Sequence, residues 1–351
     1  MSLFSFGSDN LYLGVDIGDS SLKMVELRKK GRQVQVSNYA FSENTSQINF
    51  TKIEDVNYLG RAISKVAKDA GIKALRATAS LPTFAVFSSI INISVSDKKR
   101  LAEVVNEEAK KVIPLPLEDM ILDWKVIPDE DGKTRREGNL RIFLTGSPKK
   151  LVRKYIDVFR AAKLELASLE TETFSLVRSL VGDDKTTLMI TEIGANSTDI
   201  SIVKESIPVL NRSLSVCGST LTKALSDKLG FAFAQAEQFK LDLSLSLNAD
   251  SHETLPLLLQ EAFEPVVTEM QYMLDFFQMQ NKDSRVEKII LSGGGAMLLN
   301  LADYLSKRLN INVIIGDPWN RISYPEELKP VLSEVGPRLA VAIGLAMREI
   351  Q

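Results

Sequence analysis

The chain has 351 residues and a net charge of -2, from 43 Lys and Arg against 45 Asp and Glu, so no global field favours nucleic acid or an anionic membrane. The single cysteine, Cys217, excludes an internal disulfide, and the single histidine, His252, argues against a histidine-rich metal site or a Ser-His-Asp triad. No apolar run approaches the roughly 20 residues that span a bilayer and the first residues lack the basic start of a signal peptide, so we expect a cytosolic protein of two or three domains.

The first part of the chain predicts a sheet followed by a helix. Three strand-like segments within 12–39 have the spacing of an antiparallel meander. Apolar residues then recur on one face of a predicted helix from 55 to 70. A further strand covers 74–81, and Pro82 ends it.

From residue 83 to 165 the pattern changes to that of a small α+β module inserted into the first part. The strand VFSSIINISV precedes a helix whose apolar stripe stops at IPLP, Ile113 to Pro116. Two strands separated by a charged turn follow, and a helix from about Pro148 to Ala162 completes the module.

The second half predicts strands followed by longer helices. One helix runs from Gly218 to Leu229, and a long amphipathic helix runs from about Glu253 to Gln280. The broad apolar stripe of the long helix is typical of a core helix. The last segment, LAVAIGLAMREI, is rich in small residues and predicts a helix that packs closely against its neighbours.

Two turns in the chain repeat one pattern. LGVDIGDSSLKMVEL and LMITEIGANSTDISIV each combine an apolar strand, an acidic-Ile-Gly turn and a second strand, so that Asp16 corresponds to Glu192 and Gly18 to Gly194. The glycine permits a sharp turn whose N–H groups face an anion, and Lys23 supplies a charge for phosphates. One such turn alone is equally typical of an ordinary hairpin. Two facing turns predict a polyphosphate clamp, in which the Asp16 and Glu192 carboxylates hold a hydrated Mg²⁺.

A glycine triplet forms the third element. Gly293, Gly294 and Gly295 lie between a buried strand and a helix in IILSGGGAML. Without side chains, the backbone lets a base or ribose approach, and we expect the helix N-terminus to favour a phosphate. Together with the two turns, the triplet predicts a nucleotide between two similar domains. The chain has no Walker-type lysine motif, which argues against a P-loop enzyme.

These motifs resemble those of the actin/Hsp70/sugar-kinase ATPase superfamily. Within it, the chain is most similar to the PilM family of actin-like proteins of type IV pilus assembly, with the FtsA-like cell-division proteins next. The segments that carry the resemblance are VDIGDSSLKMVEL, EEAKKVIPLPLEDMILDWKVI, AEQFK, LSGGGAMLLNLADYLSKRL and AIGLAMREI, so it covers nearly the whole chain. It implies an α/β, actin-like ATPase fold of two RNase H-like domains around a nucleotide cleft, with an α+β subdomain inserted in the first.

The resemblance also implies domain limits. The expected limits are 1–82, 166–186 and 333–351 for the first domain, 83–165 for the inserted subdomain, and 187–332 for the second domain, with a helical subdomain at about 225–285.

The resemblance further assigns residues to ATP and Mg²⁺. The implied phosphate contacts are Asp16, Gly18, Ser20, Ser21, Lys23, Gly194, Asn196, Ser197 and Thr198. The implied nucleoside contacts are Glu237 and Lys240 for the ribose and Gly218, Gly293, Gly294, Gly295 and Met297 for the adenosine pocket. Mg²⁺ is expected at Asp16 and Glu192, through water. For the ribose pair, a solvated helix face is the alternative interpretation.

Two positions depart from the family pattern. Glu192 stands where Asp is usual, and one extra methylene displaces its carboxylate by about 1 Å in a kind of site that tolerates little error. Cys217 precedes Gly218 where Gly-Gly is common, and we interpret it as a small buried cysteine. Candidates for a catalytic base are Glu170, Glu172 and Glu192, although a carboxylate at a helix start needs no catalytic role. Hydrolysis of ATP is therefore expected to be slow or absent.

The resemblance implies an ATP-binding scaffold, cytoplasmic and peripheral at the inner membrane. Its expected partner is the N-terminal cytosolic tail of a PilN-like bitopic membrane protein, bound by the first domain and its insert, so the membrane is reached only indirectly. Nucleotide is expected to set the closure of the two halves. The alternatives are an FtsA-like filament-forming division protein, whose C-terminal membrane helix we do not find, and a small-molecule kinase, whose substrate motif we do not find. Self-association stays an expectation, because actin-like domains polymerise readily.

Overall fold

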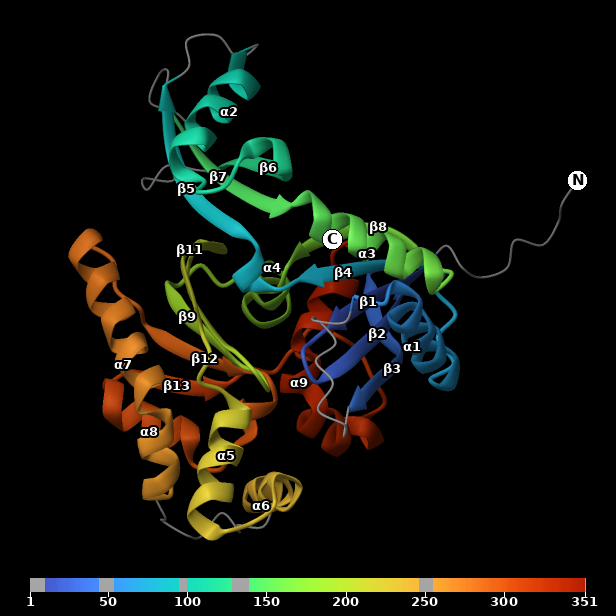
Figure 1. Ribbon diagram of the computed structural model, residues 1–351, viewed down its shortest axis with the longest axis vertical. Helices are drawn as coiled ribbons and strands as arrows, with labels where there is room; N and C mark the ends of the chain where they lie inside the picture. Colours follow the sequence, from blue (N-terminus) through green and yellow to red (C-terminus); the bar gives the residue numbers. More distant parts are fainter. Residues whose placement is uncertain (1–9, 44–53, 95–99, 128–138, 246–254, 351) are drawn as a thin grey trace, which may run out of the picture.

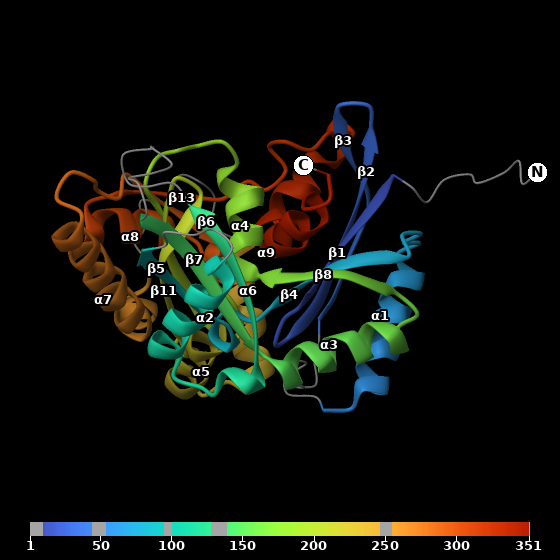
Figure 2. The same ribbon diagram turned by 90° about the horizontal axis from the view of Figure 1, so that it is seen from above.

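The computed structural model describes residues 10–43, 54–94, 100–127, 139–245 and 255–350. Within these residues the chain forms two five-stranded sheets and one three-stranded sheet (Figure 1). Helix α9 (Lys329–Met347) lies between the two large sheets, and the small sheet lies at one end of the molecule. Figure 2 shows α9 on one face of the first sheet and α1 (Val56–Asp69) with α3 (Lys149–Ala161) on the opposite face.

The first sheet contains the predicted meander. In spatial order its strands are β3 (Gln33–Glu43), β2 (Ser21–Lys30), β1 (Leu11–Ile17), β4 (Arg76–Leu81) and β8 (Glu165–Thr171). The first three are antiparallel, whereas β4 runs parallel to β1 and β8 runs parallel to β4. Helix α1 begins after Asp55, whose carboxylate accepts the Tyr58 N–H at 3.0 Å and so caps the helix. The sequence predictions for this part are confirmed.

The second sheet repeats the centre of the first. In spatial order its strands are β11 (Ile207–Leu214), β10 (Thr198–Lys204), β9 (Leu188–Ile193), β12 (Lys288–Ser292) and β13 (Asn312–Ile315). Its β9–β10 hairpin and parallel β12 correspond to the β1–β2 hairpin and parallel β4 of the first sheet. Both halves therefore present a hairpin turn at the same place in the sheet.

Helices cover one face of the second sheet. They are α5 (Gly218–Leu229), α6 (Phe233–Leu245), α7 (Leu257–Gln280) and α8 (Leu301–Leu309). Phe263 and Met270 of α7 pack with Ile200 and Ile289 of the sheet in one buried core, as the apolar stripe predicted. The start predicted for this helix, at 253, lies outside the described residues.

Helix α9 joins the two halves through close backbone contacts. A Cβ on Gly344 would lie 1.9 Å from the Ser175 carbonyl oxygen, and a Cβ on Gly14 of β1 would lie 1.9 Å from the Ala342 carbonyl oxygen. The segment Glu326–Met347 is long and apolar enough to cross a membrane by length and composition, which sequence inspection did not identify, but 67% of its apolar window is buried inside the protein. Here it forms the core helix that both large sheets share.

The third sheet forms the inserted module. It contains β5 (Phe87–Ser94), β7 (Asn139–Pro148) and β6 (Met120–Ile127) in that order, and α2 (Leu101–Val112) packs on it. By contrast, Tyr155 and Phe159 of α3 are buried in the core of the first sheet. We therefore propose that the insert spans about 83–148 and that α3 belongs to the first domain. The other expected domain limits stay proposals.

The helix that follows β8 has two parts. Helix α4 (Glu172–Leu176) continues as the π-helical turn η5 (Val177–Val181). The Arg321 guanidinium donates to the Arg178 carbonyl oxygen in this turn, and Gly182 ends it at a φ of 62°. The segment therefore departs from a regular α-helix at a place where both large sheets meet α9.

Candidate functional site

The two predicted turns face each other across one small cavity. Its lining includes Asp16, Gly18, Asp19, Ser20, Ser21 and Lys23 from the first turn, and Glu192, Gly194, Asn196, Ser197 and Asp199 from the second. Its volume is about 60 Å³, well below the 300–1,000 Å³ of ordinary small-molecule sites. The two halves thus lie close together, and a whole nucleotide can enter only after they separate.

Both turns have the same backbone geometry. The Gly18 N–H donates to the Ser21 carbonyl oxygen at 3.0 Å, and the Gly194 N–H donates to the Ser197 carbonyl oxygen at 2.9 Å. The pseudo-repeat seen in the sequence is therefore a repeat in structure. Because the N–H groups of the two glycines close the turns, the predicted contact with an anion depends on the other N–H groups of each turn.

The first turn carries a buried ion pair. Asp16 is 2% exposed, and its carboxylate accepts Lys23 Nζ at 2.8 Å and Ser80 Oγ at 3.0 Å. Asp16 and Lys23 are directly opposite each other on β1 and β2. Burial alone would lower the pKa of Lys23, but the charges of Asp16 and Glu192 outweigh it and the pKa is raised. Lys23 is therefore a fixed positive charge in the cavity.

The second turn places two carboxylates where the first has an ion pair. Glu192 on β9 is directly opposite Asp199 on β10. Burial raises the pKa of Asp199, although hydrogen bonds from Ser213 and Ser197 oppose the shift. Burial and the neighbouring carboxylates raise the pKa of Glu192 to about 8, although Lys23 opposes the shift. Burial and nearby negative charge therefore disfavour the charged form of Glu192, and a bound cation would favour it.

Asp199 of the second turn lines the cavity but was not among the predicted site residues, and the alternation of side chains along a strand explains why. In the pseudo-repeat Thr198 corresponds to Leu22, and Asp199 corresponds to Lys23. Thr198, like Leu22, is fully buried and does not line the cavity, whereas Asp199 does. The phosphate contact predicted for Thr198 is therefore wrong. Because successive side chains on a strand alternate between faces, the Lys23 register could have identified Asp199.

Glu170 and Glu172 have different surroundings. The carboxylate of Glu172 lines the cavity and accepts the Thr83 N–H at 2.9 Å and the Thr83 hydroxyl at 3.1 Å. Burial, followed by the nearby carboxylates, raises the pKa of Glu172. Glu170 does not line the cavity, since its carboxylate accepts hydrogen bonds from Arg178 and Arg348. The geometry removes Glu170 as a catalytic candidate.

The predicted ribose residues lie beside the start of α5. Lys240 Nζ donates to the Gly218 carbonyl oxygen at 3.0 Å, to Thr222 Oγ1 at 2.8 Å and to the Glu237 carboxylate at 2.8 Å. Cys217, 1% exposed, precedes α5 as the small buried residue we expected. Glu237 and Lys240 thus form a polar cluster on the second half, and neither lines the phosphate cavity.

The glycine triplet differs from its prediction in one respect. It leads into the 3₁₀ turn η6 (Gly294–Met297), and α8 begins only at Leu301. The expected helix N-terminus is therefore absent at the triplet. A Cβ on Gly293 or Gly295 would overlap Ile193 at 2.5 and 2.2 Å. These two glycines are needed for packing, and Gly294 is the exposed member of the triplet.

The cavity fits a hydrated cation better than a directly bound one. No cluster of three or more His, Cys, Asp or Glu that could hold a metal ion occurs in the described residues. However, Asp199 Oδ1 is buried without a hydrogen-bond partner, and Glu192 opposes it with a second carboxylate. A hydrated Mg²⁺ beside this pair would satisfy the buried oxygen and offset the repulsion. Asp16 is already neutralised by Lys23, so the second turn carries most of the unmet negative charge.

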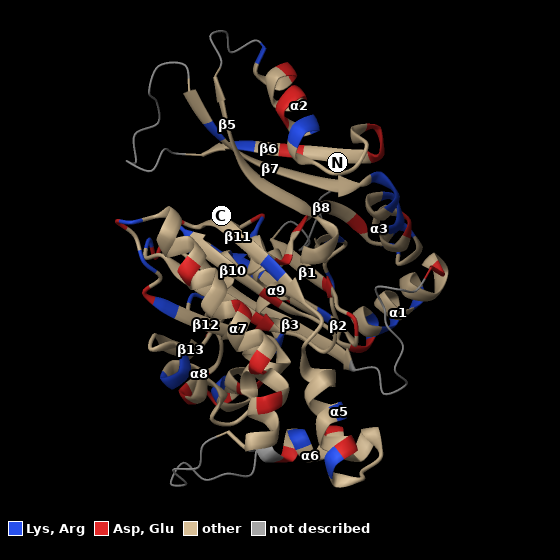
Figure 3. Cartoon of the chain, turned by 60° about the vertical axis from the view of Figure 1, so that its left-hand side comes forward, with Lys and Arg blue, Asp and Glu red and all other residues tan. Residues whose placement is uncertain are grey.

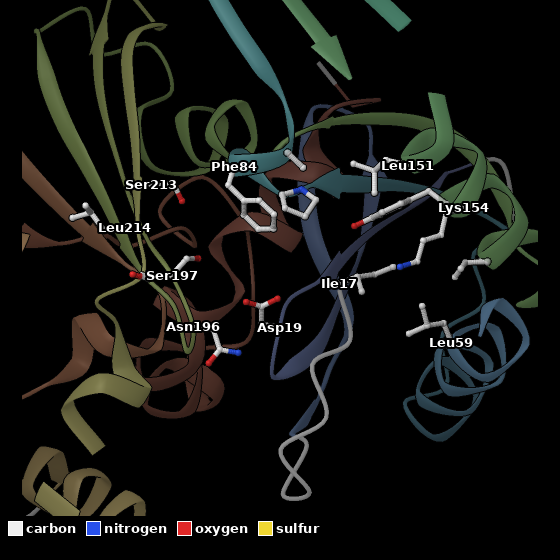
Figure 4. A pocket seen from close by; sticks show the side chains of 15 residues that line it. Ile17, Asp19, Leu59, Phe84, Leu151, Lys154, Asn196, Ser197, Ser213 and Leu214 are labelled. Atoms are coloured by element: carbon white, nitrogen blue, oxygen red, sulfur yellow. The ribbon is translucent and has the colours of Figure 1, made fainter. Parts of the chain in front are cut away.

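A larger cavity of about 760 Å³ adjoins the small one and shares Asp19, Phe84 and Asn196 with it. Figure 4 shows Phe84, Leu59 and Leu151 around it, with Asp19 and Asn196 on the two facing turns. None of the predicted adenosine or ribose residues lines this cavity. Ile17, Pro82 and Ser197 also line both cavities, so this partly apolar space between α1, α3 and the second turn is continuous with the small cavity.

Comparison with known proteins places the chain in one family. A family model described as "Type IV pilus assembly protein PilM" matches residues 14–350. The structure is similar to that of a "PilM-PilN type IV pilus biogenesis complex", with a TM-score of 0.82 and 24% identity over 97% of this chain and 98% of that chain.

Two more distant structures share the fold. They are the ethanolamine utilization protein EutJ from Carboxydothermus hydrogenoformans, at a TM-score of 0.55 and 15% identity over 96% of this chain and 89% of that one, and MreB 5 of Spiroplasma citri bound to AMPPNP, at 0.55 and 12% over 98% and 97%. The chain therefore belongs to the PilM family of type IV pilus assembly proteins and has the actin-like ATPase fold.

Proposed function

We propose that this protein binds MgATP between its two facing turns and acts as a nucleotide-dependent scaffold of type IV pilus assembly. One observation carries the proposal: two equivalent hairpin turns from two equivalent sheets meet at one cavity that holds a buried lysine and unneutralised carboxylates. The phosphates of a bound nucleotide would offset the positive charge of the lysine, and the accompanying cation would offset the negative charge of the carboxylates. An MreB with the same fold was solved bound to AMPPNP, a nucleotide ligand.

Each part of the site has an assigned role in this proposal. Lys23, held by Asp16, neutralises the terminal phosphates, and the hydroxyls of Ser20 and Ser21 donate to them, while the Ser197 hydroxyl donates to Asp199. Glu192 and Asp199 hold the waters of Mg²⁺. On the second half, the cluster of Glu237 and Lys240 binds the ribose, and the backbone at Gly294 lies against the adenosine.

Hydrolysis is expected to be slow. Asp19 and Glu172 are the carboxylates of the cavity that have no other assigned role, and Glu172 already accepts two hydrogen bonds from Thr83. Burial raises the pKa of Glu172, so less of it is in the charged form that a general base requires. Bound nucleotide therefore acts by setting the separation of the two halves, which is a shift of population.

The proposed partner is the N-terminal cytosolic tail of a PilN-like membrane protein. Family membership and the likeness to a PilM-PilN complex support it. Recruitment by such a tail would make the protein cytoplasmic and peripheral at the inner membrane. Lys and Arg outnumber Asp and Glu along α1 and α3, whereas α2 and α8 carry both signs (Figure 3).

We place the tail in the 760 Å³ cavity beside α1 and α3. Leu59, Leu151 and Phe84 give it apolar walls, and Phe84 is 61% exposed. Phe84 follows Thr83, which Glu172 of the phosphate cavity holds. A peptide side chain against Phe84 would therefore contact the segment that joins the first sheet to the insert. Thr83 of this segment is hydrogen-bonded to Glu172, which lines the proposed phosphate site.

A labelled tail peptide from a PilN-like protein tests this scaffold role. With MgATP present, we expect the peptide to bind and Leu151→Asp to weaken binding at least about tenfold, because a charge would enter an apolar wall. Ile156→Asp is the matched control, since Ile156 is 42% exposed on the same helix and does not line the cavity. Fluorescence anisotropy with and without MgATP is the measurement. Equal loss in both variants would refute the placement, and absence of peptide binding would refute the partner.

A further inference from the structure

A second groove lies between the inserted module and the second sheet. Its volume is about 630 Å³, and its walls are β5 on one side and β11 with the end of α7 on the other. Figures 1 and 2 both show β5 and β11 side by side. Neither the two turns nor the glycine triplet reaches this groove, so the proposed nucleotide site does not account for it.

The groove faces two open strand edges. Strand β5 is the outermost strand of the third sheet, and β11 is the outermost strand of the second. Consecutive residues of each strand, 87–90 and 208–213, line the groove. A cavity over a sheet face would be lined by every second residue, because neighbouring side chains on a strand point to opposite faces. The consecutive lining therefore indicates that the strand edges themselves face the groove.

The two edges are joined by side chains. Asn211 Nδ2 donates to Ser88 Oγ at 3.2 Å, and within the described residues no backbone hydrogen bond joins β5 to β11. Asn211 Oδ1 is buried without a hydrogen-bond partner. Pro208 lacks an N–H, so the usable edge of β11 begins after it. Because the two strands already contact each other here, an extended chain in the groove runs over this contact, where it could donate a hydrogen bond to the buried amide oxygen.

The lining also specifies the chemistry of the occupant. Arg141, Lys204 and Arg212 line the groove, and its lining contains no Asp or Glu. Arg212 also pairs with Glu269, outside the lining, whose carboxylate lies 3.5 Å from its Nε. Phe87 and Phe277 supply apolar surface between the cations. This combination suits a segment that alternates acidic and apolar side chains.

We propose that this groove binds an extended, acidic segment of a partner protein, which lies over the contact between β5 and β11. The site is separate from the proposed tail cavity, which lies against α1 and α3 and contains a lysine and several apolar residues. Because its walls belong to the insert and to the second sheet, an occupant holds these two parts at a fixed separation. The proposal does not depend on ATP binding.

Two labelled peptides of alternating sequence, Glu-Val and Lys-Val, test the groove in the full chain by fluorescence anisotropy. The Glu-Val peptide is expected to bind at least about tenfold more tightly, and Arg212→Glu is expected to weaken its binding by about tenfold or more. Arg212 is 53% exposed, so the variant is expected to fold. Lys307→Glu, an exposed cation on α8 outside the groove, is the control and should leave binding unchanged.

Hydrogen exchange locates the bound peptide. Occupation of the groove predicts slower exchange of the amides of 88–90 and 209–213 when the Glu-Val peptide is present. Equal binding of the two peptides, unchanged binding by Arg212→Glu, or protection confined to α1 and α3 would each overturn the proposal. A dimer in light scattering that Arg212→Glu dissociates would assign the groove to a second copy of the chain and also overturn it.

Discussion

Gly344→Ala is expected to destabilise the protein by about 3 kcal/mol or more, because overpacking against backbone cannot be relieved by a rotamer change. The added Cβ would lie 1.9 Å from the Ser175 carbonyl oxygen and 2.5 Å from its carbon, so α9 must move away from α4. Both large sheets pack on α9, and a shift of this helix disturbs both halves. Urea unfolding followed by circular dichroism measures the change.

Gly294→Ala is the matched control for this prediction. Its added Cβ would meet only the Arg338 side chain, at 3.5 Å, so the free energy of unfolding should change by less than about 1 kcal/mol. Equal unfolding midpoints for Gly344→Ala and the wild type would show that α9 and α4 can separate at little cost. That result would contradict the close backbone contact between α9 and α4 described above.

Glu170→Ala is expected to cost about 3–5 kcal/mol, because it leaves a buried arginine without its counter-charge. Glu170 Oε1 and Oε2 accept Arg178 Nη1 and Nη2 at 2.5 and 2.9 Å, and Oε2 also accepts Arg348 Nη1 at 3.2 Å. The side chains of Glu170 and Arg178 are 8% and 15% exposed. Arg178 Nη1 also donates to the Gly344 carbonyl oxygen at 2.8 Å, so the network ties β8 to α9.

The same strand provides the control. Glu165 lies in β8 and pairs with Arg76, but both side chains are more than half exposed, at 64% and 63%. Glu165→Ala should therefore cost less than about 1 kcal/mol. Thermal and urea unfolding of both variants give the comparison. A similar, small loss in the two variants would mean that the Glu170 network adds no more than a surface pair.

Much of the fold and the two turns of the candidate site follow from local sequence patterns. The two turns could be predicted because the acidic-Ile-Gly pattern recurs with the same flanking strands, and both turns close with the same hydrogen bond. Helix α5 has its predicted bounds, and the apolar stripe of α7 is buried as predicted. These features depend on residues near one another in the chain.

The remaining features depend on contacts that the sequence does not place. The role of Glu170 depends on Arg178 and Arg348, one of them 178 positions away. Phe84 adjoins three cavities only because the insert leaves the first sheet at that point. The π-helical turn after α4 has no local breaker inside it and is accompanied by a contact from Arg321, far along the chain.

Asp199 and Thr198 illustrate an error that the sequence itself could have prevented. Both follow the second turn and both are polar, so residue type did not separate them. Alignment of Thr198 with Leu22 and of Asp199 with Lys23 separates them, because successive residues lie on opposite faces of the strand. The buried hydroxyl of Thr198, which has no hydrogen-bond partner, is the structural mark of the difference.

Calorimetric titration of MgATP into the nucleotide-free protein is the most direct test of the two-turn clamp, with one variant from each turn. The account predicts binding by the wild type and a loss of at least about tenfold in both Asp16→Asn and Asp199→Asn, since Asp16 fixes the position of Lys23 for the phosphates and Asp199 holds the waters of the cation. Both substitutions keep the side-chain shape, and circular dichroism checks the fold. Absence of wild-type binding, or full binding by either folded variant, would contradict the account.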